Sequence, residues 1–242
     1  MPSLKNFPTA ISLLIFGIIC CATTALAAPV ATITHLSGPL AVHKSNGVVK
    51  ALSIGSQLDE GDTVVTERRT YARLKFTDGG EVTLKPNSQF MVEAYAYDRN
   101  NPQGDTGSFG LIKGGLRTIT GQIGKRGNQE RYRMKTPTAT IGIRGTVYDA
   151  HFCQGGDCGA SIEPGLYLVV AGGSVVVTND AGVQTTLQVK AGQYVYVKDA
   201  ATPPVLLPAR PDIPFNPPPS VGSSASGRRV QPGAGNSDCQ VR

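Results

Sequence analysis

Polar and apolar residues alternate in the middle of the chain with the period expected of β-strands. Leu74 and Phe76, and then Val82 and Leu84, occupy every second position. The positions between them are polar, namely Arg73, Lys75, Glu81, Thr83 and Lys85. A period of two places the two sets on opposite faces of a sheet. Asp78-Gly79-Gly80 separates the runs and supplies the positive φ angles of a tight turn, so this stretch predicts a hairpin.

The same kind of pattern continues through most of the chain. Tyr132 and Met134 alternate with basic residues, and 175–177 and 194–197 are runs of β-branched or aromatic residues. Glycine-containing turns separate the runs, and no long segment has a helical period. We therefore predict one all-β domain over residues 28–200, a length ordinary for a sandwich or barrel.

Two hairpins share a sequence pattern 135 positions apart. The matching positions are Gly38, Val42, Gly47, Val48 and Leu52 in one copy and Gly173, Val177, Gly182, Val183 and Leu187 in the other. Each copy predicts a strand, a glycine turn and a returning strand. We expect the hairpins around Gly47 and Gly182 to lie near each other, as the first and last strands of a jelly roll do.

The N-terminal segment predicts export. Lys5 precedes an apolar run from Ala10 to Ala22, and Ala25-Leu26-Ala27 has the spacing of a cleavage site. Residues 1–27 are therefore predicted to be a signal peptide that is removed before Ala28. An uncleaved membrane anchor is the alternative, although the run is shorter than the about 20 residues of a typical span. We expect the mature chain in the periplasm, at the cell surface or secreted, with no transmembrane segment.

The C-terminal segment, residues 201–242, has a different composition. Prolines recur up to Pro219, and serine- and glycine-rich sequence follows. Few large apolar residues are present to offset the entropy of ordering it. We predict a disordered tail whose proline-rich part is an extended, semi-stiff spacer.

Cysteine usage agrees with an oxidising compartment. Two of the five cysteines lie in the predicted signal peptide. Cys153 and Cys158 flank a glycine-containing turn, which predicts a disulfide. A metal site that includes His151 is the alternative, but it has three candidate ligands where structural zinc sites normally have four. We expect no metal and no cofactor, and Cys239 is left without an assigned partner.

Motifs for catalysis are absent from the sequence. It contains three histidines, and none has the spacing of a metalloenzyme motif. There is no Gly-x-Ser-x-Gly nucleophile elbow. The segment ending in Gly124-Lys125 departs from a phosphate loop, because Ile119 replaces the first glycine and Arg126 the serine or threonine. The sequence indicates a protein that is not an enzyme.

Basic residues gather between residues 113 and 144, where Glu130 is the one acid among eight lysines and arginines. Alternation places three of them on one strand face, and two more precede that strand. The candidate patch for an anionic partner is Lys125, Arg126, Arg131, Arg133 and Lys135. A face that only keeps the protein soluble is the alternative. Nucleic acid is not expected, since Tyr132 is the one aromatic residue interleaved for base stacking.

Several motifs together resemble the FecR domain. The most specific is the segment Thr136-Pro137-Thr138-Ala139-Thr140-Ile141-Gly142-Ile143-Arg144-Gly145-Thr146, which is similar to the family's hallmark. Gly61-Asp62-Thr63-Val64-Val65-Thr66, and the residues from Ala72 to Gly79, are similar to its opening. The resemblance covers residues 30–200 and implies a single jelly-roll-like β-sandwich on the outer side of the cytoplasmic membrane.

The motif residues have two interpretations. Thr136, Pro137, Gly145 and Thr146 are expected to shape the entry into a strand. Arg144 either projects towards an acidic partner or ties a neighbouring turn or carboxylate with its several donors, and we favour the structural role.

Three hypotheses for function follow. The leading one is an exported, non-catalytic binding module whose partner is an envelope protein or an anionic glycan or lipid. The second is an envelope signalling component, since the resemblance implies a path from an outer-membrane transporter to a sigma factor. We favour the first because no cytoplasmic anti-sigma segment precedes the domain. The third is an unrecognised glycan-active enzyme built on a converging acid pair.

Overall fold

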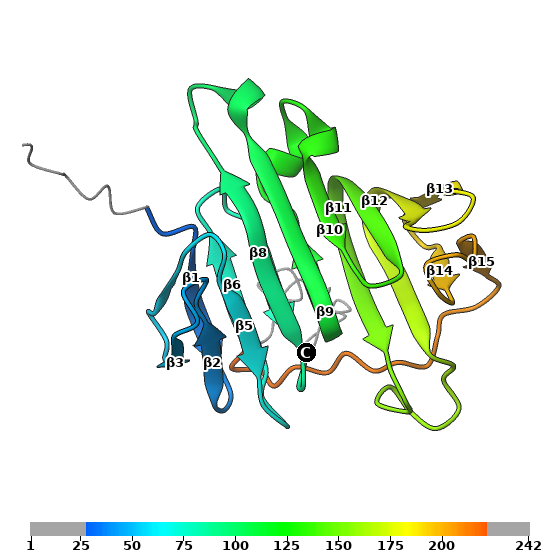
Figure 1. Ribbon diagram of the computed structural model, residues 1–242, viewed down its shortest axis with the longest axis horizontal. Helices are drawn as coiled ribbons and strands as arrows, with labels where there is room; N and C mark the ends of the chain where they lie inside the picture. Colours follow the sequence, from blue (N-terminus) through cyan, green and yellow to red (C-terminus); the bar gives the residue numbers. More distant parts are fainter. Residues whose placement is uncertain (1–27, 222–242) are drawn as a thin grey trace, which may run out of the picture.

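The computed structural model describes residues 28–221, and strands make up half of them (Figure 1). The all-β prediction is confirmed. The described elements include three short 3-10 turns, η1 (Pro102–Gly104), η2 (Ile123–Lys125) and η3 (Gln129–Arg131). The strands are β1 (Ala31–Leu36), β2 (Leu40–His43), β3 (Val49–Leu52), β4 (Gln57–Leu58), β5 (Thr63–Thr66), β6 (Ala72–Phe76), β7 (Glu81–Leu84), β8 (Gln89–Ala96), β9 (Thr106–Ile119), β10 (Tyr132–Lys135), β11 (Ala139–Cys153), β12 (Gly165–Asn179), β13 (Thr186–Lys190), β14 (Tyr194–Val197) and β15 (Val205–Leu207). In this part of the chain we find no helix with the length and apolar character needed to cross a bilayer.

Strand pairing divides the domain into two layers that share three strands. Layer A has the order β3-β2-β5-β8-β9-β10-β11-β12-β13. Layer B has the order β4-β1-β6-β7-β9-β11-β12-β14-β15. Because β9, β11 and β12 give one half to each layer, hydrogen bonds connect all 15 described strands into one network. The more detailed assignment to a jelly roll stays a prediction.

The three shared strands change layer at glycines. β9, β11 and β12 each have 14 or 15 residues. Gly114, Gly145 and Gly173 lie near their middles, with φ angles of 79°, 60° and 72°. The pairing of β11 with β12 shifts register at the same place, between Arg144 and Val147. Since residues with a Cβ adopt this backbone conformation only at a cost, glycine marks each crossing.

The space between the layers is filled by one hydrophobic core. Phe90 and Phe109 of layer A stack with their ring centroids 5.6 Å apart. Phe76 of layer B meets Phe109 edge-on at 5.2 Å, so aromatic contacts join the two layers. Leu74 and Leu84, which alternation assigned to an apolar face, are fully buried here. The hairpin predicted around Asp78-Gly79-Gly80 is confirmed as β6 and β7.

The outer face of layer B is covered, which the alternation pattern did not predict. Arg73 on β6 and Thr83 on β7 point away from the core, yet they are 4% and 3% exposed. The cover comes from residues 208–221, which we call the strap. After β15 has paired with β14, the strap crosses layer B towards β6 (orange in Figure 1).

The structure therefore differs from the disordered tail that composition predicted from residue 201 onwards. Residues 205–207 form a strand, and Ile213, Phe215 and Val221 of the strap are buried. Burial of three apolar side chains offsets part of the entropy of ordering this segment. Residues 222–242, and the signal peptide predicted over residues 1–27, lie outside the described part of the chain.

Both repeated patterns form hairpins, but the hairpins are not neighbours. β2 and β3 form one, and the second half of β12 forms the other with β13. They lie at opposite edges of layer A, on the two sides of the molecule in Figure 1. The expectation that they lie near each other is wrong, because five strands separate β2 from β12 in this layer.

Candidate functional site

The basic strand has the alternation that the sequence predicted. Tyr132 and Met134 of β10 are buried in the core, at 4% and 0% exposure. Arg131, Arg133 and Lys135 are exposed. β10 lies between β9 and β11, so Arg133 and Lys135 belong to the outer face of layer A, whereas Arg131 is the last residue of η3, just before the strand.

Two members of the candidate patch are already paired within the domain. Arg126 Nε donates to Asp105 Oδ2 at 2.9 Å, and its guanidinium lies 4.8 Å from the centre of the Tyr97 ring. Lys135 Nζ lies 2.8 Å from Glu93 Oε2. Arg126 therefore holds the segment before β9 in place, and Lys135 ties β10 to β8. Neither is a free cation for a partner.

Arg133 instead borders a groove together with Arg144. Arg133 on β10 pairs with Gly142 on β11, which pairs with Val176 on β12. A cavity of about 230 Å³ opens over this row. Among residues 28–221, no carboxylate lies within ion-pair distance of either arginine. The lining residues are Glu130, Arg133, Thr140, Gly142, Ile143, Arg144, Val176 and Thr178.

Gly142 leaves the floor of this groove open. Its φ angle is not in the left-handed region, so the backbone does not require glycine there. A Cβ built on Gly142 would have the Val176 carbonyl oxygen as its nearest neighbour, at 3.7 Å, which is an ordinary contact. Neither packing nor backbone conformation requires glycine at this position. The missing side chain leaves open space between Arg133 and Arg144.

Lys125, another member of the predicted patch, lies close to the bend in β11. A Cβ at Gly145, next to Arg144, would lie 3.6 Å from Lys125 Cγ. Sequence reasoning placed Lys125 in the patch and favoured a structural role for Arg144. The structure gives Arg144 an exposed position, and no hydrogen bond or ion pair of its guanidinium is found among the described residues. The available signal was alternation within β11, where Ile141 and Ile143 are buried.

The other motif residues shape the backbone. Thr136 Oγ1 accepts a hydrogen bond from the amide of Ala139 at 3.0 Å and so closes the turn into β11. Thr146 donates through its amide to Thr120 Oγ1 at 2.8 Å and through its own hydroxyl to the carbonyl of Ser174 at 2.6 Å. Gly145 provides the bend between the layers. Pro137 is exposed in the turn.

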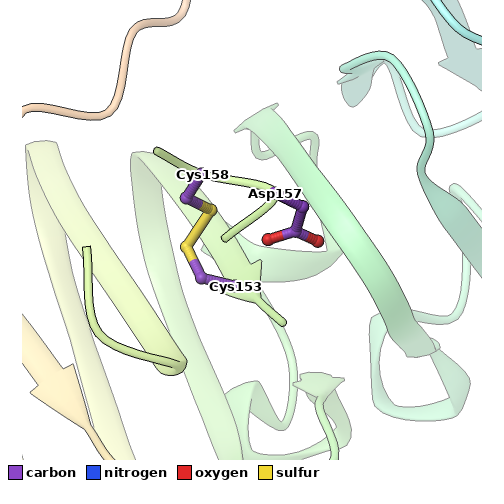
Figure 2. Close-up of side chains that lie close together, drawn as sticks. All are labelled: Cys153, Asp157 and Cys158. Carbon is purple, nitrogen blue, oxygen red and sulfur yellow. A yellow bond between two sulfur atoms is a disulfide. The ribbon is translucent and has the colours of Figure 1, made fainter. Parts of the chain in front are cut away.

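The predicted disulfide between Cys153 and Cys158 is confirmed, and Figure 2 shows it at the end of β11. Asp157 lies inside its loop and accepts a hydrogen bond from the amide of Gln154 at 2.8 Å. By chain entropy, a loop this short stabilises the fold by about 2 kcal/mol. Asp157 and the two sulfur atoms form a cluster of the kind that can bind metals. However, sulfur atoms bonded to each other are not thiolates, so they offer no metal site here.

A row of mostly charged residues crosses the outer face of layer B. Arg73, Thr83, Arg117 and Asp149 pair in order across β6, β7, β9 and β11. Arg117 donates to both carboxylate oxygens of Asp149, at 2.6 and 2.8 Å. These hydrogen bonds raise the pKa of Arg117 although burial opposes its charge.

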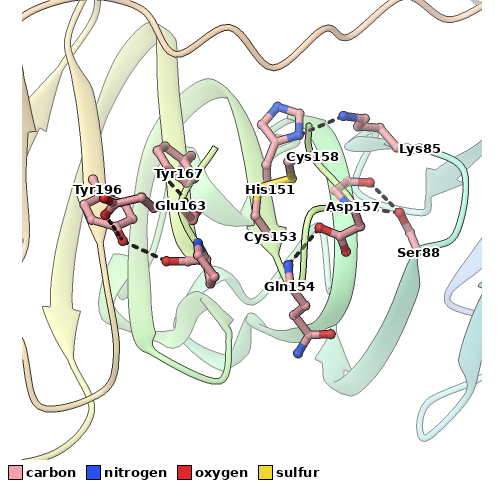
Figure 3. Close-up of a disulfide and its surroundings, with 12 residues drawn as sticks. Lys85, Ser88, His151, Cys153, Gln154, Asp157, Cys158, Glu163, Tyr167 and Tyr196 are labelled. Atoms are coloured by element: carbon pink, nitrogen blue, oxygen red, sulfur yellow. Dashed lines mark hydrogen bonds between the residues drawn. A yellow bond between two sulfur atoms is a disulfide. The ribbon is translucent and has the colours of Figure 1, made fainter. Parts of the chain in front are cut away.

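His151 belongs to the same face. Lys85 Nζ lies 3.2 Å from His151 Nδ1 and donates to it, as the dashed line in Figure 3 marks. Burial lowers the pKa of the Lys85 ammonium, although Asp149 and Asp157 oppose this effect. His151 is 1% exposed, so it is not placed to exchange protons with a substrate in solvent.

The clearest pair of carboxylates beside a cavity is held by a lysine. Asp59 and Asp62 lie at an opening of about 240 Å³, and both accept from Lys44 Nζ, at 2.8 and 2.7 Å. Burial opposes the charge of Lys44, but its two carboxylate partners raise its pKa. The amide of Asp59 also donates to Asp62, at 2.9 Å. These contacts lock the turn that carries both carboxylates.

Comparisons with solved structures give distant likenesses. One, described as "Cell surface anchoring domain", is 28% identical over 26% of this chain and 83% of that chain, with a TM-score of 0.25. Two structures of a protein from Parabacteroides distasonis, assigned as an anti-sigma factor, are 11% and 12% identical. Each of these two alignments covers 60% of this chain and 58% of the solved chain, with a TM-score of 0.43. No curated protein matches the chain.

The family comparison addresses the motifs directly. Residues 62–175 match the family model described as FecR protein. This stretch begins in the turn before β5 and ends in β12, so it includes the Thr136–Thr146 motif and the whole of β9, β10 and β11. The match confirms, over residues 62–175, the resemblance to the FecR family that the sequence motifs indicated.

Proposed function

We propose that this protein is a non-catalytic binding module of the bacterial envelope, and that the groove between Arg133 and Arg144 holds an anionic group of its ligand. The observation that carries the proposal is the open floor at Gly142 between two arginines without carboxylate partners. Arginine presents planar donors that suit carboxylate and phosphate groups. Exposed cations within a Debye length also add their fields, which favours anionic partners.

Matched variants test the groove. Arg133→Gln and Arg144→Gln each remove one unpaired charge. Lys135→Gln is the control, because it removes a charge on the same strand as Arg133, but one that is already paired with Glu93. Gly142→Ala fills the floor without changing charge. The probes are vesicles of phosphatidylglycerol or phosphatidylcholine, and polygalacturonate or neutral dextran. These arms distinguish a lipid phosphate from a glycan carboxylate.

We expect salt-sensitive binding to one anionic probe. Arg133→Gln and Arg144→Gln should each weaken it about fivefold or more, since about 1 kcal/mol corresponds to that factor. Gly142→Ala should weaken it as well, and Lys135→Gln should change it little. If Lys135→Gln weakens binding as much as Arg133→Gln, the general positive field rather than the groove attracts the probe. If wild type and all variants are retained equally, the groove is not a site.

A second candidate is a signalling component of the FecR type, which the family match over residues 62–175 supports. Crosslinking in the native envelope tests it, because a signalling component should be recovered with a membrane-spanning regulator or a transporter. Recovery with a glycan or lipid alone would favour the first candidate. The family match also favours a binding or regulatory protein over the glycan-active enzyme.

A further inference from the structure

The strap binds the domain through side chains at alternate positions. Ile213 and Phe215 are buried, whereas Asp212, Pro214 and Asn216 between and beside them are exposed. Ile213 packs against Tyr167 and the Cys153 end of β11. Such alternation is that of an extended segment with one face towards its binding surface.

The Phe215 ring occupies a site built from three strands or their flanks. The Arg117 guanidinium of β9 lies 4.3 Å from the centre of the ring. Tyr71, just before β6, meets it edge-on at 6.2 Å, and His151 of β11 lies at 6.5 Å. An arginine over an aromatic face adds a cation–π attraction to the apolar contact.

The strap does not extend the sheet. Its backbone hydrogen bonds run within itself, from the amide of Ile213 to Pro211 and from that of Val221 to Pro218. No backbone-to-backbone hydrogen bond links residues 208–221 to the rest of the described chain. The strap is instead anchored by side chains, and Arg73 Nη2 donates to the carbonyl of Val221 at 2.7 Å. A segment held in this way can leave without breaking a strand ladder.

The surface below the strap is also unlike the exterior of a core. It carries Arg73, Lys85, Arg117 and Asp149, and Arg210 of the strap adds a contact of 3.8 Å to Asp149. A cover needed only to bury an apolar face would lie on apolar residues. Interfaces between domains of one chain are more polar than permanent ones, and arginine and aromatic residues are enriched in protein interfaces.

We propose that this charged outer face of layer B is a docking surface for an extended, proline-containing peptide with two apolar side chains two positions apart. The strap occupies it in the isolated chain, and a partner's segment of the same chemistry replaces the strap. Prolines stiffen such a peptide in advance, which lowers the entropy lost on docking. This surface lies in layer B and does not depend on the groove in layer A.

The test uses the full chain and a labelled synthetic peptide of residues 208–221. In a variant with both Ile213→Ala and Phe215→Ala, the chain's own strap loses its anchors and the docking surface is free. We expect this variant to bind the peptide at least about tenfold more tightly than wild type, because the tethered strap competes at an effective concentration of about a millimolar. A peptide with the same two alanine changes is the control and should not bind.

Three results would overturn the proposal. One is no peptide binding by the double variant when hydrogen exchange shows that its strap has opened. Another is equal binding of the native and alanine peptides. The third is loss of the fold in both the double variant and the milder Phe215→Leu chain, since a replaceable segment is not required for folding.

Discussion

His151 shows how the strap changes the chemistry of a single residue. It lies on β11 beneath Phe215, and its Nδ1 accepts from Lys85. Burial, and then the positive charges of Lys85, Arg117 and Arg210, lower the pKa of His151 to about 3. The imidazole therefore stays neutral in the folded protein under mildly acidic conditions.

The pH dependence of the free energy of unfolding should reveal the lowered pKa of His151. The unfolded chain exposes His151 with a pKa near 6.5, so between pH 6.5 and about 3 it takes up a proton that the folded chain does not. The contribution of His151 to the free energy of unfolding should be fully present above about pH 6.5 and should decrease as the pH falls through this window. His151→Gln, which keeps an acceptor for Lys85, should remove that part of the decline. Urea unfolding at about pH 7.5 and about pH 4.5 measures the difference.

Carboxylates titrate over part of the same range, so a second histidine serves as the reference. His43 is exposed at the end of β2, and His43→Gln should keep the wild-type decline. Parallel curves for wild type and His151→Gln would contradict the argument.

Local alternation was enough to predict which side of β10 faces solvent, but not which cations are free. Whether a cation is free depends on which residues of other strands and loops the fold places beside it. Glu93 reaches Lys135 from a bulge in β8, and Asp105 reaches Arg126 from the loop before β9. Neither contact follows from spacing along the chain, so the proposed groove keeps Arg133 from the predicted patch and adds Arg144.

At the scale of elements, the crossings of the long strands determine how the layers are joined. Gly145 of β11 and Gly173 of β12 lie next to each other where both strands change layer. A Cβ on Gly173 would lie 2.3 Å from the carbonyl oxygen of Gly145. Backbone rather than a flexible side chain would have to move to admit it.

Neighbouring glycines in β12 therefore provide a matched pair of variants. Gly173→Ala should lower the free energy of unfolding by about 3 kcal/mol or more, from a left-handed φ angle and a backbone clash. Gly172→Ala should be neutral or slightly stabilising, because its Cβ would meet Val147 Cβ at 3.8 Å and its φ angle is ordinary. Denaturant unfolding of both variants checks this, and equal stabilities would refute the role assigned to the crossing.

Sequence pattern located the strands and the Asp78-Gly79-Gly80 turn, because both are local properties. Strand order was not local. The two repeated hairpins end at opposite edges of layer A, since a hairpin's own residues do not determine which strand it pairs with next. The strap was missed for a related reason. Its Ile213-Pro214-Phe215 anchor is short, and composition over the whole proline-rich segment outweighed it.

At the scale of the whole molecule, the two candidate surfaces face opposite ways. The groove lies on the outer face of layer A and the strap on the outer face of layer B, with the core between them. A ligand in the groove therefore would not block a second partner that replaces the strap. This arrangement suits a module that connects two components.

Export of the intact module stays a prediction, and it concerns the whole chain. The Lys5, apolar run and Ala25-Leu26-Ala27 pattern predicts that the mature protein begins at Ala28 with Pro29 next. Mass spectrometry of the protein recovered from the envelope or medium should show that N-terminus. An intact Met1 or Lys5 in the exported protein would exclude cleavage.

The hydrogen bond between Arg73 and Val221 joins residues that are 148 positions apart. The predicted export would deliver the chain from its N-terminus, so every described strand of both layers would reach the envelope before the strap's last residue. β6, β7, β9 and β11 can therefore pair while Arg73, Arg117 and Asp149 are still in contact with water. If this face docks a partner as we propose, a partner present during that interval meets no competing strap. The order in which the segments arrive would then favour capture of the partner before the strap has docked.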